Sequence, residues 1–85
     1  MLPYEIRFTK VAVKDTKELT SSRKKKLKEI LQNRIVVDPY SGKKLAGDLS
    51  DFYSVKLSYS DRIVYSVDEE SHIVYIHRTR THYGE

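Results

Sequence analysis

The chain has 85 residues, a formal net charge of +4 and no cysteine, and its pI is near 9.3. This length predicts one small domain over residues 1–85, and the lack of thiols excludes disulfides and thiolate metal sites. No window approaches the roughly 20 apolar residues of a membrane span, and the opening MLPYEIRF lacks the basic start and apolar run of a signal peptide. We therefore expect a soluble, cytoplasmic protein without membrane contact.

Two periodicities divide the first part of the chain. Residues 3–8 alternate apolar and charged side chains, which predicts a half-buried strand. Thr9 is a suitable N-cap for a short helix that runs to about Leu19. The polar break 20–22 supplies a second cap, and residues 23–34 are strong helix formers with a narrow apolar stripe. The two helices should form an antiparallel hairpin that packs on a sheet.

The second part of the chain is rich in β-branched and aromatic residues. Pro39 ends helical structure, and residues 38–51 form a loop that is long for so small a domain, as functional loops often are. Val, Ile and Tyr then predict strands over 53–58, 62–67 and 72–79. The order β-α-α-β-β-β indicates an α+β domain with a small antiparallel sheet. The helix pair covers one face, and the other face is free to bind a partner.

The relative orientation of two basic strand residues depends on a turn. A three-residue connection between the second and third strands places Lys56 and Arg62 on the same face, and a two-residue connection separates them. The sequence leaves this register open. Tyr65 and Tyr75 share strand faces with apolar residues and are expected in the core, and His77, in mid-strand, is expected to be a packed or surface residue.

Charge is concentrated in the helical region. Residues 10–34 hold nine basic and three acidic residues, a local net charge of +6. Such a surface suits a polyanion or an acidic protein, although a solvated lysine-rich helix is an equally ordinary interpretation. The sequence has no glycine-rich phosphate loop and no metal-binding motif, and histidines at every fifth position suit a metal site poorly. No cofactor and no metal are expected.

A further group of residues suits the chemistry of a phosphodiester. Cleavage of RNA by its own 2′-hydroxyl needs a base, cations for the extra negative charge, and an acid for the leaving oxygen. Arginine binds phosphate with a planar fork, and histidine transfers protons near neutral pH. The candidates are Lys43, Lys44, Lys56, Arg62, Arg78, Arg80, His82 and Tyr83. A non-catalytic surface for nucleic acid or protein is the alternative.

Three landmarks in residues 42–85 carry a family resemblance: KKLxGxLSxxYSxKL, DRIVYxV and a terminal RTHYG. With the upstream order of elements, the chain resembles the RelE/ParE superfamily of bacterial toxins, especially its RelE and YoeB/Txe branches. The resemblance implies an endonuclease that cuts mRNA in the ribosomal A site without a metal. It also implies a cognate antitoxin that blocks the toxin, in a complex able to bind its own promoter DNA.

The same resemblance implies roles for individual basic residues. Lys56 matches a position that activates the 2′-hydroxyl or stabilises the phosphate, and Arg62 matches the arginine at the scissile phosphate. Arg80 fits a second phosphate-binding residue, with Arg78 as the alternative. Contacts to RNA or the ribosome are expected from a wider set of cations, which comprises Lys43, Lys44, Arg78, Lys24, Lys25 and Lys26.

The terminal motif and one departure from it bear on the proton transfers. His82 and Tyr83 match the His-Tyr pair of the YoeB branch, a general acid/base and a residue that holds the RNA. The glutamate base of that branch is replaced by the stretch KKL at 43–45, so the base is either His82 acting with Lys56, or Asp48. Two other functions compete: a ParE-like toxin that inhibits DNA gyrase without cutting RNA, and a passive RNA-binding module.

Overall fold

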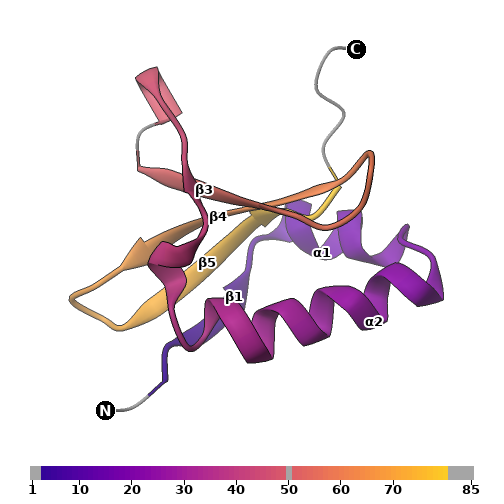
Figure 1. The fold of residues 1–85 in the computed structure, drawn as a ribbon, viewed down its shortest axis with the longest axis horizontal. Coiled ribbons are helices and arrows are strands. Elements are labelled where there is room, and N and C mark those ends of the chain that lie inside the picture. Colours follow the sequence, from indigo (N-terminus) through magenta and orange to yellow (C-terminus); the bar gives the residue numbers. More distant parts are fainter. Residues whose placement is uncertain (1–2, 50, 81–85) are drawn as a thin grey trace.

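The computed structural model describes residues 3–49 and 51–80 and shows two helices on one side of a sheet (Figure 1). The elements in chain order are β1 (Glu5–Phe8), α1 (Lys10–Lys17), α2 (Ser21–Ile30), β2 (Lys43–Lys44), β3 (Phe52–Lys56), β4 (Arg62–Asp68) and β5 (Ile73–Arg78). The predicted α+β class and the helix pair on one face are confirmed. In the described part of the chain no helix is long and apolar enough to cross a membrane.

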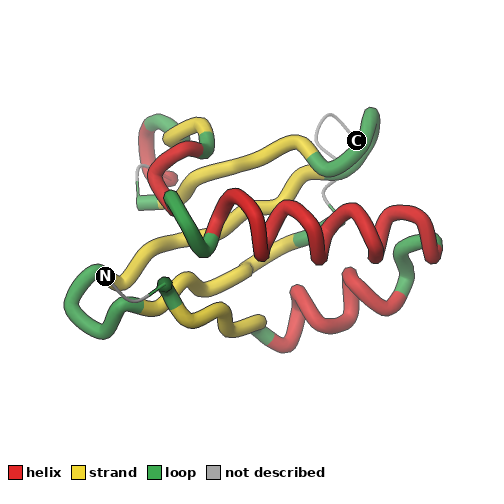
Figure 2. The backbone as a smooth tube through the Cα atoms, turned by 60° about the horizontal axis from the view of Figure 1, so that its bottom comes forward, coloured by secondary structure: helices red, strands yellow, loops and turns green. Residues whose placement is uncertain are grey.

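The sheet is mixed. Its strand order is β1-β5-β4-β3-β2, and β1 pairs with β5 in parallel, with Glu5 opposite Ile73 and Phe8 opposite Ile76. The other pairs are antiparallel, so a wholly antiparallel sheet was wrong at this one pair. The helical hairpin carries the chain away from β1, and the later strands meander back until β5 lies beside the first strand (Figure 2). The three reversals from β2 to β5 leave β5 running opposite to β2 and parallel to β1.

Side-chain caps begin both helices. The hydroxyl of Thr9 accepts a hydrogen bond from the Ala12 amide, and that of Thr20 accepts one from the Arg23 amide, both at 3.2 Å. These caps satisfy amides that have no partner inside the helix. α2 continues into a π-helical turn, Leu31–Ile35, so helical structure extends one residue beyond the predicted 23–34 and begins two residues earlier.

The long connection between α2 and β3 is more ordered than expected. It contains two short 3-10 turns, Pro39–Ser41 and Gly47–Leu49, and between them the two-residue strand β2. Lys43 lies opposite Ser54 and Lys44 opposite Tyr53. The strand was not predicted because two lysines carry no β-propensity signal. Backbone pairing with β3 defines it instead.

The core lies between the sheet and the helices. Its buried members come from both layers: Ala12, Leu19, Leu27, Leu31, Ile35, Val55, Leu57, Ile63, Tyr65, Val74 and Ile76. Tyr65 is fully buried, as predicted. The expectation for Tyr75 was wrong, because Tyr75 pairs with Arg7 and Ser66 on the other face of the sheet. Both faces of β5 carry apolar residues, so its pattern did not distinguish them.

A β-bulge interrupts β5 beside β4. Tyr65 lies opposite Ile76 but Val64 lies opposite Arg78, so His77 is the extra residue. A bulge turns a side chain away from strict alternation and increases the local twist. His77 itself follows the core residue Ile76, so alternation places it on the sheet face that carries no helix, where it contacts Ser66.

Candidate functional site

The sheet face turned away from the helices, which we call the open face, carries a pair of cations. Lys56 at the end of β3 lies directly opposite Arg62 at the start of β4. Val55 belongs to the helix-side core, so alternation places Lys56, and with it Arg62, on the open face. Both side chains are exposed. The connection, residues 57–61, is longer than either alternative considered from the sequence. It nevertheless places the two residues on one face, as the three-residue connection would have done.

This pair lacks a neutralising acid among the residues that the structure describes. Asp61, the nearest acid in sequence, lies 3.7 Å from Arg23 of α2, measured from Oδ2 to Nη1. Like charges directly opposite each other in a sheet destabilise the pairing. Two exposed cations that repel each other therefore form a site whose charge an anion can neutralise.

A third cation joins the pair from the neighbouring strand. Lys43 on β2 lies opposite Ser54, which shares the open face with Lys56. Lys44 lies opposite Tyr53, a residue packed against the helix-side core. The structure thus gathers Lys43 with the Lys56–Arg62 pair and places Lys44 on the other side of its strand. We call these three residues the cation cluster.

Arg78 and Arg80 are held by acids of the first helix. Arg78 Nε donates to Asp15 Oδ2 at 2.7 Å, and the Thr79 amide donates to the same oxygen at 3.2 Å. Arg80 forms an ion pair with Glu18. The two arginines therefore lie where the end of β5 meets α1. Both are bound to carboxylates and neither is part of the cation cluster. Either arginine must share its guanidinium donors between its carboxylate and a phosphate, or exchange one for the other.

Two opposing effects set the charge of Asp15. Burial raises the pKa of its carboxyl, whereas hydrogen bonds from Arg78 and from the amides of Thr79 and Arg80 lower it, and the net pKa is below the ordinary 3.8. Asp15 is only 8% exposed. An ionised carboxylate in this position ties the end of β5 to α1 at neutral pH.

The remaining predicted residues do not join the cluster. Lys24, Lys25 and Lys26 are exposed on α2, in the layer on the opposite side of the sheet. Asp48 is exposed in the 3-10 turn before β3. His82 and Tyr83 lie outside the described residues. Among residues 3–49 and 51–80, no group of three or more His, Cys, Asp or Glu side chains could hold a metal ion.

Sequence reasoning missed an aromatic group beside the cluster. His77 Nε2 lies 2.8 Å from Ser66 Oγ. The centroids of the Phe52 and His77 rings are 4.9 Å apart, and the two ring planes are inclined by 59°. Burial lowers the pKa of His77 below its usual 6.5. The signal for this group was the run of alternating residues in β3 and β4. It did not include His77, because the register that brings β5 beside Ser66 has no local signal in the sequence.

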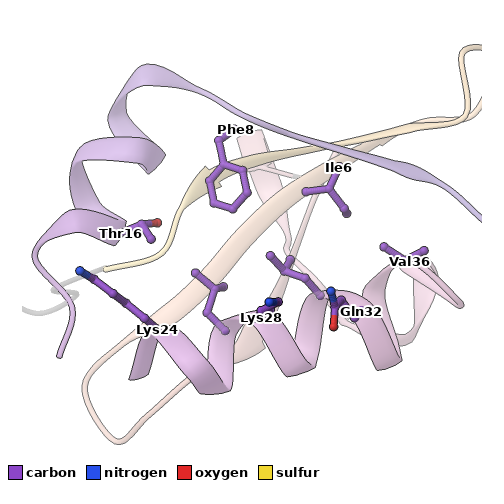
Figure 3. A pocket seen from close by; sticks show the side chains of 9 residues that line it. Ile6, Phe8, Thr16, Lys24, Lys28, Gln32 and Val36 are labelled. Carbon is purple, nitrogen blue, oxygen red and sulfur yellow. The ribbon is translucent and has the colours of Figure 1, made fainter. Parts of the chain in front are cut away.

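A second surface lies between β1 and α2. Ile6 and Phe8 project from β1 toward α2, and Lys24, Lys28 and Gln32 border the space from the helix (Figure 3). The groove has a volume of about 440 Å³, and its remaining lining is Thr16, Leu27, Leu31 and Val36. Phe8 is 36% exposed, which is high for a phenylalanine that faces a core. We call this surface the β1–α2 groove.

Solved structures of bacterial toxins share this fold. The chain is 28% identical to the match in the RelBE2 toxin–antitoxin complex of Mycobacterium tuberculosis, covering 93% of this chain and 98% of that one with a TM-score of 0.83. It is 26% identical to the match in the RelBE complex of E. coli, with coverages of 92% and 95% and a TM-score of 0.79. For YoeB of Staphylococcus aureus the identity is 26%, the coverages 95% and 99%, and the TM-score 0.80.

The fold is thus that of the RelE and YoeB toxins in these solved structures. A family profile described as the ParE-like toxin of type II bacterial toxin–antitoxin systems matches residues 6–83. The chain belongs to this family, and the resemblance seen in its sequence is confirmed. A comparison with curated protein sequences found no significant match.

Proposed function

We propose that this toxin is a ribosome-dependent endoribonuclease that cleaves translated mRNA in the A site by attack of a 2′-hydroxyl, without a cofactor. The observation that supports this most is the paired Lys56 and Arg62, joined by Lys43 on one open sheet face. Attack on a phosphodiester adds negative charge to the phosphate in the transition state. Cations already held in place stabilise that charge more than they stabilise the substrate.

The roles of the residues follow from their chemistry and from the family motif. Arg62 binds the scissile phosphate with its planar fork. Lys56, directly opposite, stabilises the attacking oxygen as it loses its proton. His82 accepts or returns a proton, and Tyr83 holds the RNA. Arg80 contributes a second phosphate contact when RNA displaces Glu18.

The partner that we propose is a cognate antitoxin, in a cytoplasmic complex. The matched structures include toxin–antitoxin complexes of RelBE2 and RelBE. In this chain the β1–α2 groove combines an apolar floor with Lys24 and Lys28 at its border, and β1 is an edge strand of the sheet. An amphipathic helix with an acidic polar face fits such a surface. We propose that the antitoxin presents such a helix.

Mapping of mRNA ends in a translating extract tests the proposed activity. Purified protein is added with and without ribosomes, and Arg62→Ala is tested in parallel as the inactive comparison. The expected result is new ends within codons that require both ribosomes and Arg62. Absence of new ends from the folded wild-type protein contradicts the proposal. Inhibition of supercoiling by purified gyrase would then assign the other activity known for toxins described as ParE-like.

A further inference from the structure

Phe52, Ser66 and His77 form a small cluster on the open face, next to the cation cluster. Phe52 and Ser66 are directly opposed residues of β3 and β4, and His77 of β5 lies on the same face as Tyr75, the partner of Ser66. The His77 ring is in contact with both, through the 2.8 Å hydrogen bond to Ser66 and the 4.9 Å approach to Phe52. The cluster is only partly buried, so ring surface faces solvent on a sheet side that no helix covers.

Its position relative to the cations suits a single nucleic-acid strand. Phe52 and Lys56 lie on the same face of β3, four residues apart, which corresponds to about 13 Å along the strand. A nucleic-acid strand whose phosphate lies between Lys56 and Arg62 can therefore reach Phe52 within a short run of nucleotides. Lys43 lies beside Ser54, between these two positions. Cations that follow a backbone next to aromatic rings are the usual arrangement for binding single strands.

The chemistry of the cluster matches that of a nucleobase. The inclined rings of Phe52 and His77 offer a flat apolar surface and an edge, and bases stack on such aromatic faces. Ser66 Oγ and His77 Nε2 share one hydrogen bond and keep further polar capacity toward a base edge. Burial lowers the pKa of His77 and so favours the neutral ring, which stacks on a base without burial of a charge.

We propose that Phe52, Ser66 and His77 form a nucleobase-binding subsite, which holds a base flanking the phosphate bound by Lys56 and Arg62. This inference rests on the proposed RNA-cleaving function. It assigns to the open face a contact with the base, whereas the cation cluster contacts only the backbone. The subsite thereby gives the toxin a preference among the nucleotides next to the cut.

The test compares two short single-stranded ligands that differ only in their bases. Full-length purified protein is titrated with an RNA hexamer and with a matched hexamer of abasic ribose phosphates, and the His77 ring C–H signals are followed by NMR. We expect the intact hexamer to bind more tightly and to shift the His77 signals. Phe52→Leu and His77→Gln should each weaken binding of the intact hexamer about tenfold and leave the abasic one unchanged.

Phe8→Leu is the matched control, because it makes the same substitution on the opposite side of the sheet and should alter neither affinity. Thermal unfolding of each variant verifies that it is folded. Equal affinity of the wild type for both ligands, no binding of either, or equal losses for both in the variants would overturn the subsite. Base-dependent binding without cleavage on ribosomes would overturn the proposed nuclease and leave the subsite in place.

Discussion

Arg78 on β5 and Asp15 on α1 form a 2.7 Å ion pair between residues 63 positions apart in sequence. The same carboxylate also accepts hydrogen bonds from the backbone amides of Thr79 and Arg80. It is the main polar link between the end of β5 and the first helix in the described part of the chain. The position of the chain that leads to the terminal motif therefore depends on Asp15.

Asp15→Asn should lower the free energy of unfolding by about 2 kcal/mol, because the substitution weakens charged hydrogen bonds to a buried group. Urea denaturation at pH 7 measures the change. Glu18→Gln is the control, since its ion pair with Arg80 is half exposed and contributes under about 0.5 kcal/mol. Equal effects of the two substitutions would contradict a special role for Asp15.

The pKa of Asp15 also predicts a dependence of stability on pH. Because the native pKa is below the ordinary 3.8, the unfolded state binds a proton first as the pH falls. The contribution of Asp15 is therefore fully present above the ordinary value and is lost as the pH falls through the native pKa. We expect the unfolding free energy of the wild type to fall more steeply in this window than that of Asp15→Asn. Parallel curves would contradict the shift.

Lys56→Glu separates function from stability at the open face. The substitution replaces a repulsive cross-strand pair with an attractive one opposite Arg62, so stability should rise by about 0.5 kcal/mol. Cleavage of mRNA should fall at least about a hundredfold, because a cation at the phosphate becomes an anion. Lys44→Glu is the control, since Lys44 lies opposite Tyr53 and away from the cluster. Full activity of Lys56→Glu would remove Lys56 from the site.

The hydroxyl of Tyr65 holds the loop that precedes β2. It is buried, donates to the Pro39 carbonyl at 2.7 Å, and has a pKa that burial raises to about 12. Tyr65→Phe should cost about 1 to 2 kcal/mol, because the carbonyl loses its partner. Tyr59→Phe, at a side chain 96% exposed, should leave the denaturation midpoint unchanged. A Tyr65→Phe protein as stable as the wild type would refute this account.

Gly42 provides a second test of the position of the Tyr65 hydroxyl, which lies close to this glycine. A Cβ at this position would overlap the Tyr65 hydroxyl and lie 3.1 Å from the Ser54 carbonyl oxygen. Gly42→Ala should therefore destabilise the protein by about 2 kcal/mol. In a Tyr65→Phe background the overlap with the hydroxyl is absent. The double variant should therefore lose less stability than the sum of the losses in the two single variants. Strict additivity in a double-mutant cycle would contradict the contact.

Ser54 is a position where a smaller, apolar residue should improve the fold. Its Oγ is buried and has no hydrogen-bond partner in the part of the chain that the structure describes. A buried hydroxyl without a partner costs free energy, so Ser54→Ala should raise stability by up to about 1 kcal/mol. Thermal and urea unfolding measure it. A decrease would show that the hydroxyl has a partner in solution.

The sequence was sufficient for what depends on local pattern. The caps at Thr9 and Thr20 and the alternation in β3 and β4 follow from residue type and period, whereas the register that sets Lys56 opposite Arg62 was left open and is given by the structure. The family landmarks in residues 42–85 identified the fold class and the cation pair independently of that pattern.

What it could not provide depends on contacts between distant segments. The parallel pairing of β1 with β5 leaves no local signal, and β2 is defined by backbone bonds to β3 rather than by its lysines. The carboxylates of Asp15 and Glu18 bind Arg78 and Arg80, which looked from the sequence like free phosphate ligands. The register that brings His77 of β5 beside Ser66 of β4 has no local signal either, and the base subsite was missed with it.

The pairing of β1 with β5 has a consequence for the order in which the protein folds during its synthesis. Glu5 meets Ile73, so the first strand has no neighbour in the sheet until nearly the whole chain has been synthesised. Contacts this distant in sequence form late, and an N-terminal strand without its partner must wait. Until β5 has been synthesised, β1 therefore remains unpaired, and its pairing with β5 is the last step that completes the sheet.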